Sequence, residues 1–107
     1  VVTLLTEVEV DPEDEAFGHP TKPVGGFYSA LEAQLLSRER GWTMIEDSMR
    51  GYRQVVASPT PKRIVQLDTI KQLVDSGTVV ICCGGGGIPV VRRPDGSLGG
   101  VAGVIDK

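Results

Sequence analysis

The sequence predicts an α/β fold with a mainly parallel sheet, interrupted by a small α+β lobe. Two segments are apolar on successive residues, Val1 to Leu5 and Thr78 to Cys83. Such runs are typical of strands that are buried on both faces of a parallel sheet. Apolar residues at helical spacing precede the second run, so the two together predict a helix–strand unit. Between them, residues 11–26 are rich in Pro, Gly and acids, and together with the short elements that follow up to residue 57 they predict the lobe.

Residues 1–10 predict one core strand that changes character along its length. Residues 1–5 are apolar throughout, whereas residues 6–10, Thr-Glu-Val-Glu-Val, alternate strictly and should have one face in water. Residues 11–26 should form a loop rather than a regular element, because Pro, Gly and acids recur in them. The apolar anchors of this region are few, namely Phe17, Val24 and Phe27.

The lobe, residues 11–57, should contain one helix and two short strands. Ser29 can cap the helix, Glu32 completes a capping box, and Gly41 ends it. Its apolar stripe is Leu31, Leu35 and Leu36. The segments 41–47 and 50–56 alternate apolar and polar residues and predict strands.

Residues 58–107 predict the return to the core, beginning with a linker, Ser58-Pro59-Thr60-Pro61. A helix follows, with apolar residues at helical spacing and Gly77 at its end. The apolar strand 78–83 comes next and leads into a glycine-rich loop. Residues 90–98 contain Pro94-Asp95-Gly96 and predict a hairpin.

Composition excludes several classes of protein. The 107 residues carry 11 Lys and Arg against 14 Asp and Glu, a net charge of −3, and 40% of them are hydrophobic. This balance does not suit binding to nucleic acid or to an anionic membrane, and no apolar run is long enough for a spanning helix. Cys82 and Cys83 are adjacent and His19 is the single histidine, so we expect neither a disulfide framework nor a metal site. A reducing, cytoplasmic setting follows as an expectation, since no signal peptide is recognised.

The segment with chemical character is Gly84-Gly85-Gly86-Gly87-Ile88-Pro89, directly after the apolar strand. Residues without Cβ let the backbone adopt positive φ and aim its N–H groups at an anion. In open α/β sheets, ligands bind beyond the carboxyl ends of strands. The loop matches neither a Walker A motif nor a dinucleotide fingerprint. A tight turn with only a packing role therefore remains an alternative.

Two lysines are candidate partners of that loop. Lys22 stands between Pro20 and Pro23, which should stiffen the segment that carries it. Lys107 follows an apolar segment, so its charge would emerge from the core. Phosphoryl transfer depends on positioning and on neutralising negative oxygens, which ammonium and backbone N–H groups can do. Taken alone, either lysine could equally be a solvated surface cation.

Several motifs in order resemble the carbamate kinase family of the amino acid kinase superfamily, over nearly all 107 residues. They are Glu7-Val8-Glu9-Val10-Asp11-Pro12, Pro20-Thr21-Lys22-Pro23-Val24-Gly25, Glu46-Asp47 with Arg50-Gly51-Tyr52-Arg53, Ser58-Pro59 with Pro61, Cys83 to Val90, and Gly103-Val104-Ile105-Asp106-Lys107. The sequence departs from the family pattern at Glu15, at Ser48-Met49 and at Ala57, which are lobe and linker positions.

The resemblance implies a fragment of a three-layer α/β/α sandwich with a protruding subdomain. It implies reversible transfer of a phosphoryl group between ATP and carbamate, giving ADP and carbamoyl phosphate, in arginine catabolism by the deiminase pathway. Mg²⁺ would accompany the nucleotide, and the parent protein would be a homodimer. By this resemblance Lys22 and Lys107 would contact the transferred phosphoryl group. Gly84, Gly85, Gly86, Gly87, Ile88 and Pro89 would wall the carbamate site.

Two alternatives remain at this point. One is another enzyme of the same superfamily that acts on a different small acid or nucleotide. The other is a non-catalytic module whose loop and lysines hold an anion or form a subunit interface. Because the family's amino-terminal phosphate loop and carboxy-terminal nucleotide half are not in the sequence, we expect the 107 residues alone to be inactive.

Overall fold

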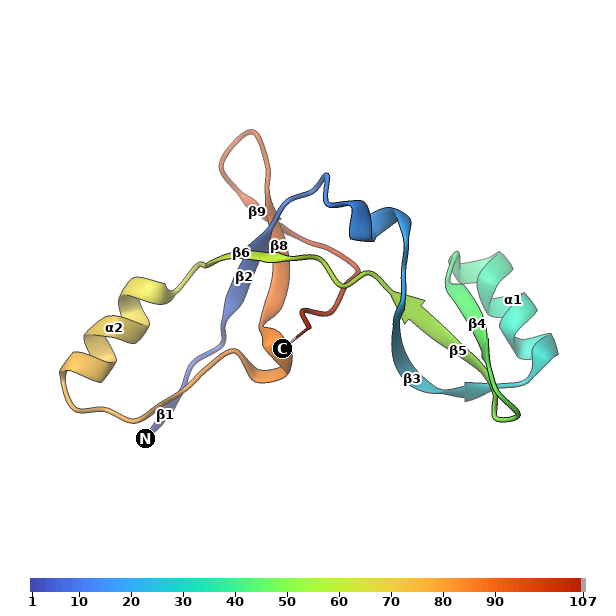
Figure 1. Cartoon of the computed structure of the whole chain (residues 1–107). Coiled ribbons are helices and arrows are strands. Elements are labelled where there is room, and N and C mark those ends of the chain that lie inside the picture. The colour runs from blue at the N-terminus through green and yellow to red at the C-terminus, as the bar shows by residue number, and fades with distance from the viewer. Residues whose placement is uncertain (107) are drawn as a thin grey trace.

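The computed structural model describes residues 1–106 as an elongated molecule of 53 × 34 × 20 Å (Figure 1). A four-stranded sheet lies at the centre, α2 lies towards one end, and α1 with a second sheet lies at the other. The elements in chain order are β1 Val2–Thr3, β2 Glu7–Val10, η1 Glu15–Gly18, β3 Lys22–Tyr28, α1 Ala30–Arg40, β4 Thr43–Asp47, β5 Gly51–Val56, β6 Pro61–Ile64, α2 Leu67–Asp75, β7 Val80–Ile81, η2 Gly84–Gly86, β8 Ile88–Arg92 and β9 Leu98–Gly100.

Parallel pairing at the centre confirms the α/β prediction. β1 pairs with β7 and β2 pairs with β8, both in parallel. The central sheet has the order β6-β2-β8-β9, and its two outer pairs, β6–β2 and β8–β9, are antiparallel. The β8–β9 pair is the predicted hairpin. α2 and Gly77, with φ +85°, match the predicted helix and its end.

The core is small and centres on β2. Val8 and Val10 are buried on it and pack with Ile105 from the end of the described chain. Phe17 and Ile64 are among the partly buried side chains that pack against this cluster. The predicted alternation of β2 is therefore confirmed, with the intervening Glu7 and Glu9 less buried than the valines.

The expectation that the two apolar runs are buried on both faces is wrong. Val1 is 86% exposed, and Leu5 and Ile81 are also exposed. β1 and β7 have two residues each and form a sheet of their own. Within residues 1–106, too little structure packs around that pair to cover both faces. Cys82 and Cys83 lie beyond β7 and are half-buried, rather than being strand residues of the core.

The second sheet, order β3-β5-β4, is fully antiparallel and packs against α1. The capping box of Ser29 and Glu32 is present, and Gly41 ends α1 in the left-handed conformation, as predicted. The predicted apolar stripe is wrong in part, because Leu31 is 67% exposed and Leu35 is exposed as well. Ala33 is the buried residue of the helix, and its small side chain permits close approach to the sheet.

β3 corrects the expectation of a loop over residues 11–26. Lys22 begins this strand and pairs with Val56, and Pro23 pairs with Val55. β3 is an edge strand, where a residue without an N–H is tolerated. Gly25 has φ +70°, and the register shifts between Val24 and Tyr28. Pro23 and the irregularity at Gly25 are thus the reason that the sequence pattern of this strand is typical of a loop.

In the part of the chain that the structure describes, neither helix is long and apolar enough to cross a membrane.

Candidate anion-binding site

The glycine-rich loop joins β7 to β8 through the short 3-10 turn η2. Cys83 enters the turn with φ +54°, in the left-handed region that non-glycine residues rarely adopt. Gly85, Gly86 and Gly87 also have positive φ, between 67° and 96°. Glycine is therefore favoured at these three positions by the path of the backbone between β7 and β8.

Two backbone amides of the loop are available to a ligand. The amides of Gly86 and Gly87 donate to the carbonyl oxygens of Cys83 and Gly84, at 2.9 and 3.1 Å, and that of Ile88 donates to the Thr6 carbonyl. The amides of Gly84 and Gly85 donate to no acceptor within residues 1–106, and both residues are exposed. Neighbouring N–H groups in such a turn form a concavity suited to a small anion.

Close packing on both sides fixes the loop. A Cβ on Gly86 would lie 2.7 Å from the carbonyl oxygen of Ile105, and a Cβ on Gly87 would overlap the Val8 side chain. Ile88 and Pro89 continue into β8 and pair with Glu7 and Val8. The loop is thus held between the start of β2 and the segment that ends at Asp106.

Lys22 reaches this segment from the other sheet. Its Nζ lies 2.9 Å from Oδ1 of Asp106, and the two side chains are 38% and 72% exposed. Asp106 follows Ile105, the residue against which Gly86 packs. The structure therefore brings Lys22 and the glycine-rich loop to the same short segment. Lys107, the second predicted lysine, lies outside the described residues.

Within residues 1–106, neither Cys83 beside the loop nor His19 offers an obvious nucleophile. Desolvation by burial, with a smaller effect of Cys82, raises the pKa of Cys83 above its ordinary value of 9.0, so the thiol stays protonated at neutral pH. His19 is exposed. Residues 1–106 contain no group of three or more His, Cys, Asp or Glu side chains that could hold a metal ion.

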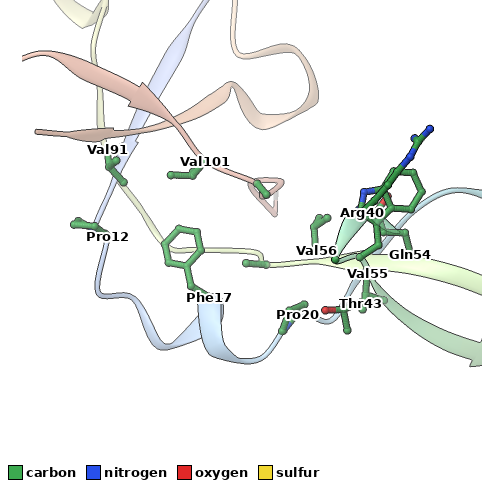
Figure 2. A pocket seen from close by; sticks show the side chains of 14 residues that line it. Pro12, Phe17, Pro20, Arg40, Thr43, Gln54, Val55, Val56, Val91 and Val101 are labelled. Carbon is green, nitrogen blue, oxygen red and sulfur yellow. The ribbon is translucent and has the colours of Figure 1, made fainter. Parts of the chain in front are cut away.

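A separate pocket of about 590 Å³ lies where the β6-β2-β8-β9 sheet meets the β3-β5-β4 sheet (Figure 2). The Phe17 ring lies beside it, and most of its other lining residues are also apolar, with Arg40 and Gln54 among the polar ones. Neither Lys22 nor any residue of the glycine-rich loop lines it. Its mostly apolar lining, in which Arg40 is the charged residue, suits a small anion less well than the exposed amides of Gly84 and Gly85.

Sequence reasoning missed two residues of the site. Asp106 pairs with Lys22 across 84 positions, and the Thr6 hydroxyl accepts from the Cys83 amide across 77. Neither contact has a local pattern that could predict it. The only available signal for Thr6 was its position, at the start of the alternating half of the first strand.

No family model matches the chain. Curated proteins match over its whole length: the carbamate kinase of Clostridium perfringens is 56% identical over 107 residues, and that of Trichomonas vaginalis is 52% identical over 108. Each match covers 100% of this chain and 34% of the relative. The chain therefore spans about a third of the length of these relatives.

Solved structures agree with the sequence matches. The carbamate kinase of Giardia lamblia bound to AMP-PNP has a TM-score of 0.88 and 48% identity, covering 99% of this chain and 34% of that one. A crystal structure from Aeropyrum pernix K1 has a TM-score of 0.94 and 43% identity, covering 100% and 35%. Motifs, strand pairing and sequence identity thus agree that the chain is similar, over its whole length, to about a third of a carbamate kinase.

Proposed function

We propose that this chain supplies part of the phosphoryl-transfer site of a carbamate kinase. The reaction is ATP plus carbamate to ADP plus carbamoyl phosphate, in either direction. A carbamate oxygen forms a bond to the γ-phosphorus while the bond from that phosphorus to the ADP oxygen breaks. The observation that supports the proposal is the meeting of Lys22, Asp106 and the glycine-rich loop at one segment.

Lys22 is proposed to neutralise the transferred phosphoryl group. Its ion pair with Asp106 is solvent-exposed, and exposed pairs contribute only about 0–1 kcal/mol. The ammonium group can therefore leave Asp106 for a phosphoryl oxygen at small cost. Its position at the start of β3 fixes its backbone, so binding costs only the freedom of the side chain.

The loop is proposed to hold the small acid. The amides of Gly84 and Gly85 would donate to a carbamate or phosphate oxygen, while Ile88 and Pro89 would form the adjacent wall. Such preorganised donors act on charge that develops during transfer. Lys107 is proposed as a second cation at the same group, by its place directly after Asp106 in the sequence.

Nucleotide and Mg²⁺ binding are proposed for the wider protein. A relative from Giardia lamblia was solved with AMP-PNP, and this chain covers 34% of it. The described residues contain no cluster of three or more metal-ligating side chains, so Mg²⁺ would be carried by the nucleotide phosphates rather than by this part of the chain. A cytoplasmic homodimer acting in arginine catabolism completes the proposal.

The alternatives within the superfamily are less well supported. Relatives that are 52–56% identical over the full chain carry the name carbamate kinase, which favours this enzyme over one that acts on a different acid. A non-catalytic module would retain an anion-binding loop but would not need Lys22 for turnover. The two readings therefore differ in the kinetic effect of that lysine.

The test uses a chimera in which this chain replaces the matching third of the Clostridium perfringens carbamate kinase. Phosphorylation of ADP by carbamoyl phosphate is measured for the chimera and for Lys22→Ala, Lys107→Ala and Lys71→Ala. Lys71 is exposed on α2 and serves as the matched control. We expect losses in kcat/KM above about tenfold for the first two variants and none for the third. An inactive but folded chimera, or losses below about tenfold, worth ~1.4 kcal/mol, would overturn the proposal.

A further inference from the structure

We infer that Thr6 is a positioning residue that fixes both ends of the glycine-rich loop. This inference rests on the proposed function, because it concerns the same site. Thr6 is only 3% exposed, and within residues 1–106 it is the one polar residue among the buried residues. A buried hydroxyl is retained at little cost only when its hydrogen bonds are satisfied, so its partners indicate its role.

The Thr6 hydroxyl makes two hydrogen bonds with assigned directions. It accepts from the Cys83 amide at 2.9 Å and donates to the Leu4 carbonyl at 2.9 Å. A hydroxyl has one hydrogen, and an amide can only donate, so no other arrangement satisfies all three groups. The lone pair that faces Cys83 is therefore fixed by the bond to Leu4.

The main chain of Thr6 holds the other end of the loop. Its carbonyl accepts from the Ile88 amide at 2.9 Å. Cys83 precedes the four glycines and Ile88 follows them. Thr6 therefore makes a hydrogen bond at each end of the glycine-rich loop. Thr6 stands between β1 and β2, at the point where parallel pairing passes from the β1–β7 pair to the β2–β8 pair.

The hydroxyl bond also supports an unfavourable backbone conformation. Cys83 has φ +54°, and such residues persist only where the surroundings determine them. Cys83 directs the chain into η2, whose first amides are those of Gly84 and Gly85. The hydrogen bond from Cys83 to Thr6 thus sets the direction in which the two free amides point.

The consequence is a specific kinetic effect. Loss of the hydroxyl should displace the amides that bind the small acid while leaving the nucleotide unaffected. In the chimera, Thr6→Val is expected to raise KM for carbamoyl phosphate about tenfold or more, with KM for ADP within about twofold of the parent value. Thr6→Ser, which keeps the hydroxyl, should restore the parent KM.

Two further measurements separate positioning from general stability. Val90→Ala removes buried apolar contacts on β8 without removing a hydrogen bond to the loop, so it is the matched destabilised control. Amide hydrogen exchange should become at least about tenfold faster at Cys83 in Thr6→Val but not in Val90→Ala. Exchange at Ile88, whose acceptor is a backbone carbonyl, should change less than exchange at Cys83.

The outcomes distinguish this inference from the proposed function. If the chimera has no activity although it is folded, the proposed function fails, and exchange at Cys83 still decides the role of Thr6. If Thr6→Val and Val90→Ala change KM for carbamoyl phosphate equally, or if exchange at Cys83 is unchanged, Thr6 has only a packing role and the inference is overturned.

Discussion

Lys22 and Asp106 form an ion pair of 2.9 Å across 84 positions of sequence, and this pair ties the β3-β5-β4 sheet to the end of the described core. Lys22 begins β3, and Asp106 follows the buried Ile105. The pair is one of two ion pairs within residues 1–106; the other joins Glu9 to Arg92 inside the central sheet. Of these two pairs, the Lys22–Asp106 pair is thus the one that joins the β3-β5-β4 sheet to the segment after Ile105.

Asp106→Asn should change the binding of anions more than the stability of the fold. The pair is exposed, so its loss should lower the free energy of unfolding by less than about 1 kcal/mol. The freed ammonium group should meet less competition from protein carboxylate, so inorganic phosphate should bind more tightly. Urea unfolding and isothermal calorimetry with phosphate check these two effects. A stability loss above about 2 kcal/mol would show instead that the carboxylate has a structural role.

Alanine substitutions in the glycine-rich loop should separate two kinds of glycine. Gly87→Ala should lower the free energy of unfolding by more than about 2 kcal/mol, because φ is +90° and the new Cβ would overlap the Val8 side chain. Gly84→Ala meets nothing within 4 Å and should lie within about 0.5 kcal/mol of the parent. Equal losses for the two variants in urea unfolding would contradict the described path of the loop.

Local signals predicted the elements that local chemistry controls. The capping box of Ser29 and Glu32, the left-handed Gly41 and the Pro94-Asp95-Gly96 turn all appear where the sequence placed them. β3 escaped prediction, because Pro23 and Gly25 are breakers in most contexts and are tolerated here by an edge strand with a bulge. Residue propensities are averages over many environments, and an edge strand tolerates Pro and Gly better than most strands do.

Contacts between distant residues could not be predicted in the same way. The bonds from Cys83 to Thr6 and from Lys22 to Asp106 depend on how strands from opposite ends of the chain come together. The periodicity of apolar residues predicts which face of a strand is buried, but it does not predict which strand lies beside it. The glycine-rich loop and Lys22 were identified from their residue types, whereas the residues that hold them in place required the three-dimensional arrangement.

Ser29→Ala should destabilise the second sheet with its helix by about 1 kcal/mol. The hydroxyl accepts from the Glu32 amide at 3.2 Å, and alanine leaves that first-turn amide without its partner. Ser37→Ala, at an exposed position within the same helix, is the matched control and should cause no loss. Helical circular dichroism during urea unfolding measures both. Identical midpoints for the two variants would mean that the cap adds nothing to stability.

Acidification should weaken the fold partly through Asp14. The Ala16 and Thr60 amides donate to its two carboxylate oxygens, each at 2.9 Å, and these bonds hold the pKa of Asp14 below its ordinary value of 3.8. A carboxyl with a lowered folded pKa stabilises the protein above its unfolded pKa, and this contribution is lost as pH falls through the folded pKa. The bond to Thr60 joins the η1 segment to the linker that leads to β6, so its weakening should loosen the junction of the two sheets.

The measurement is the free energy of unfolding in urea, from about pH 6 to about pH 3. The parent chain should lose stability most steeply below about pH 4, and Asp14→Asn should flatten that part of the curve because the amide cannot titrate. Glu39→Gln, at an exposed position on α1, removes one charge without touching this junction and should retain the parent slope. Since the net charge changes equally in both variants, a flattened curve in Glu39→Gln as well would assign the acid sensitivity to overall charge rather than to the Asp14 contacts.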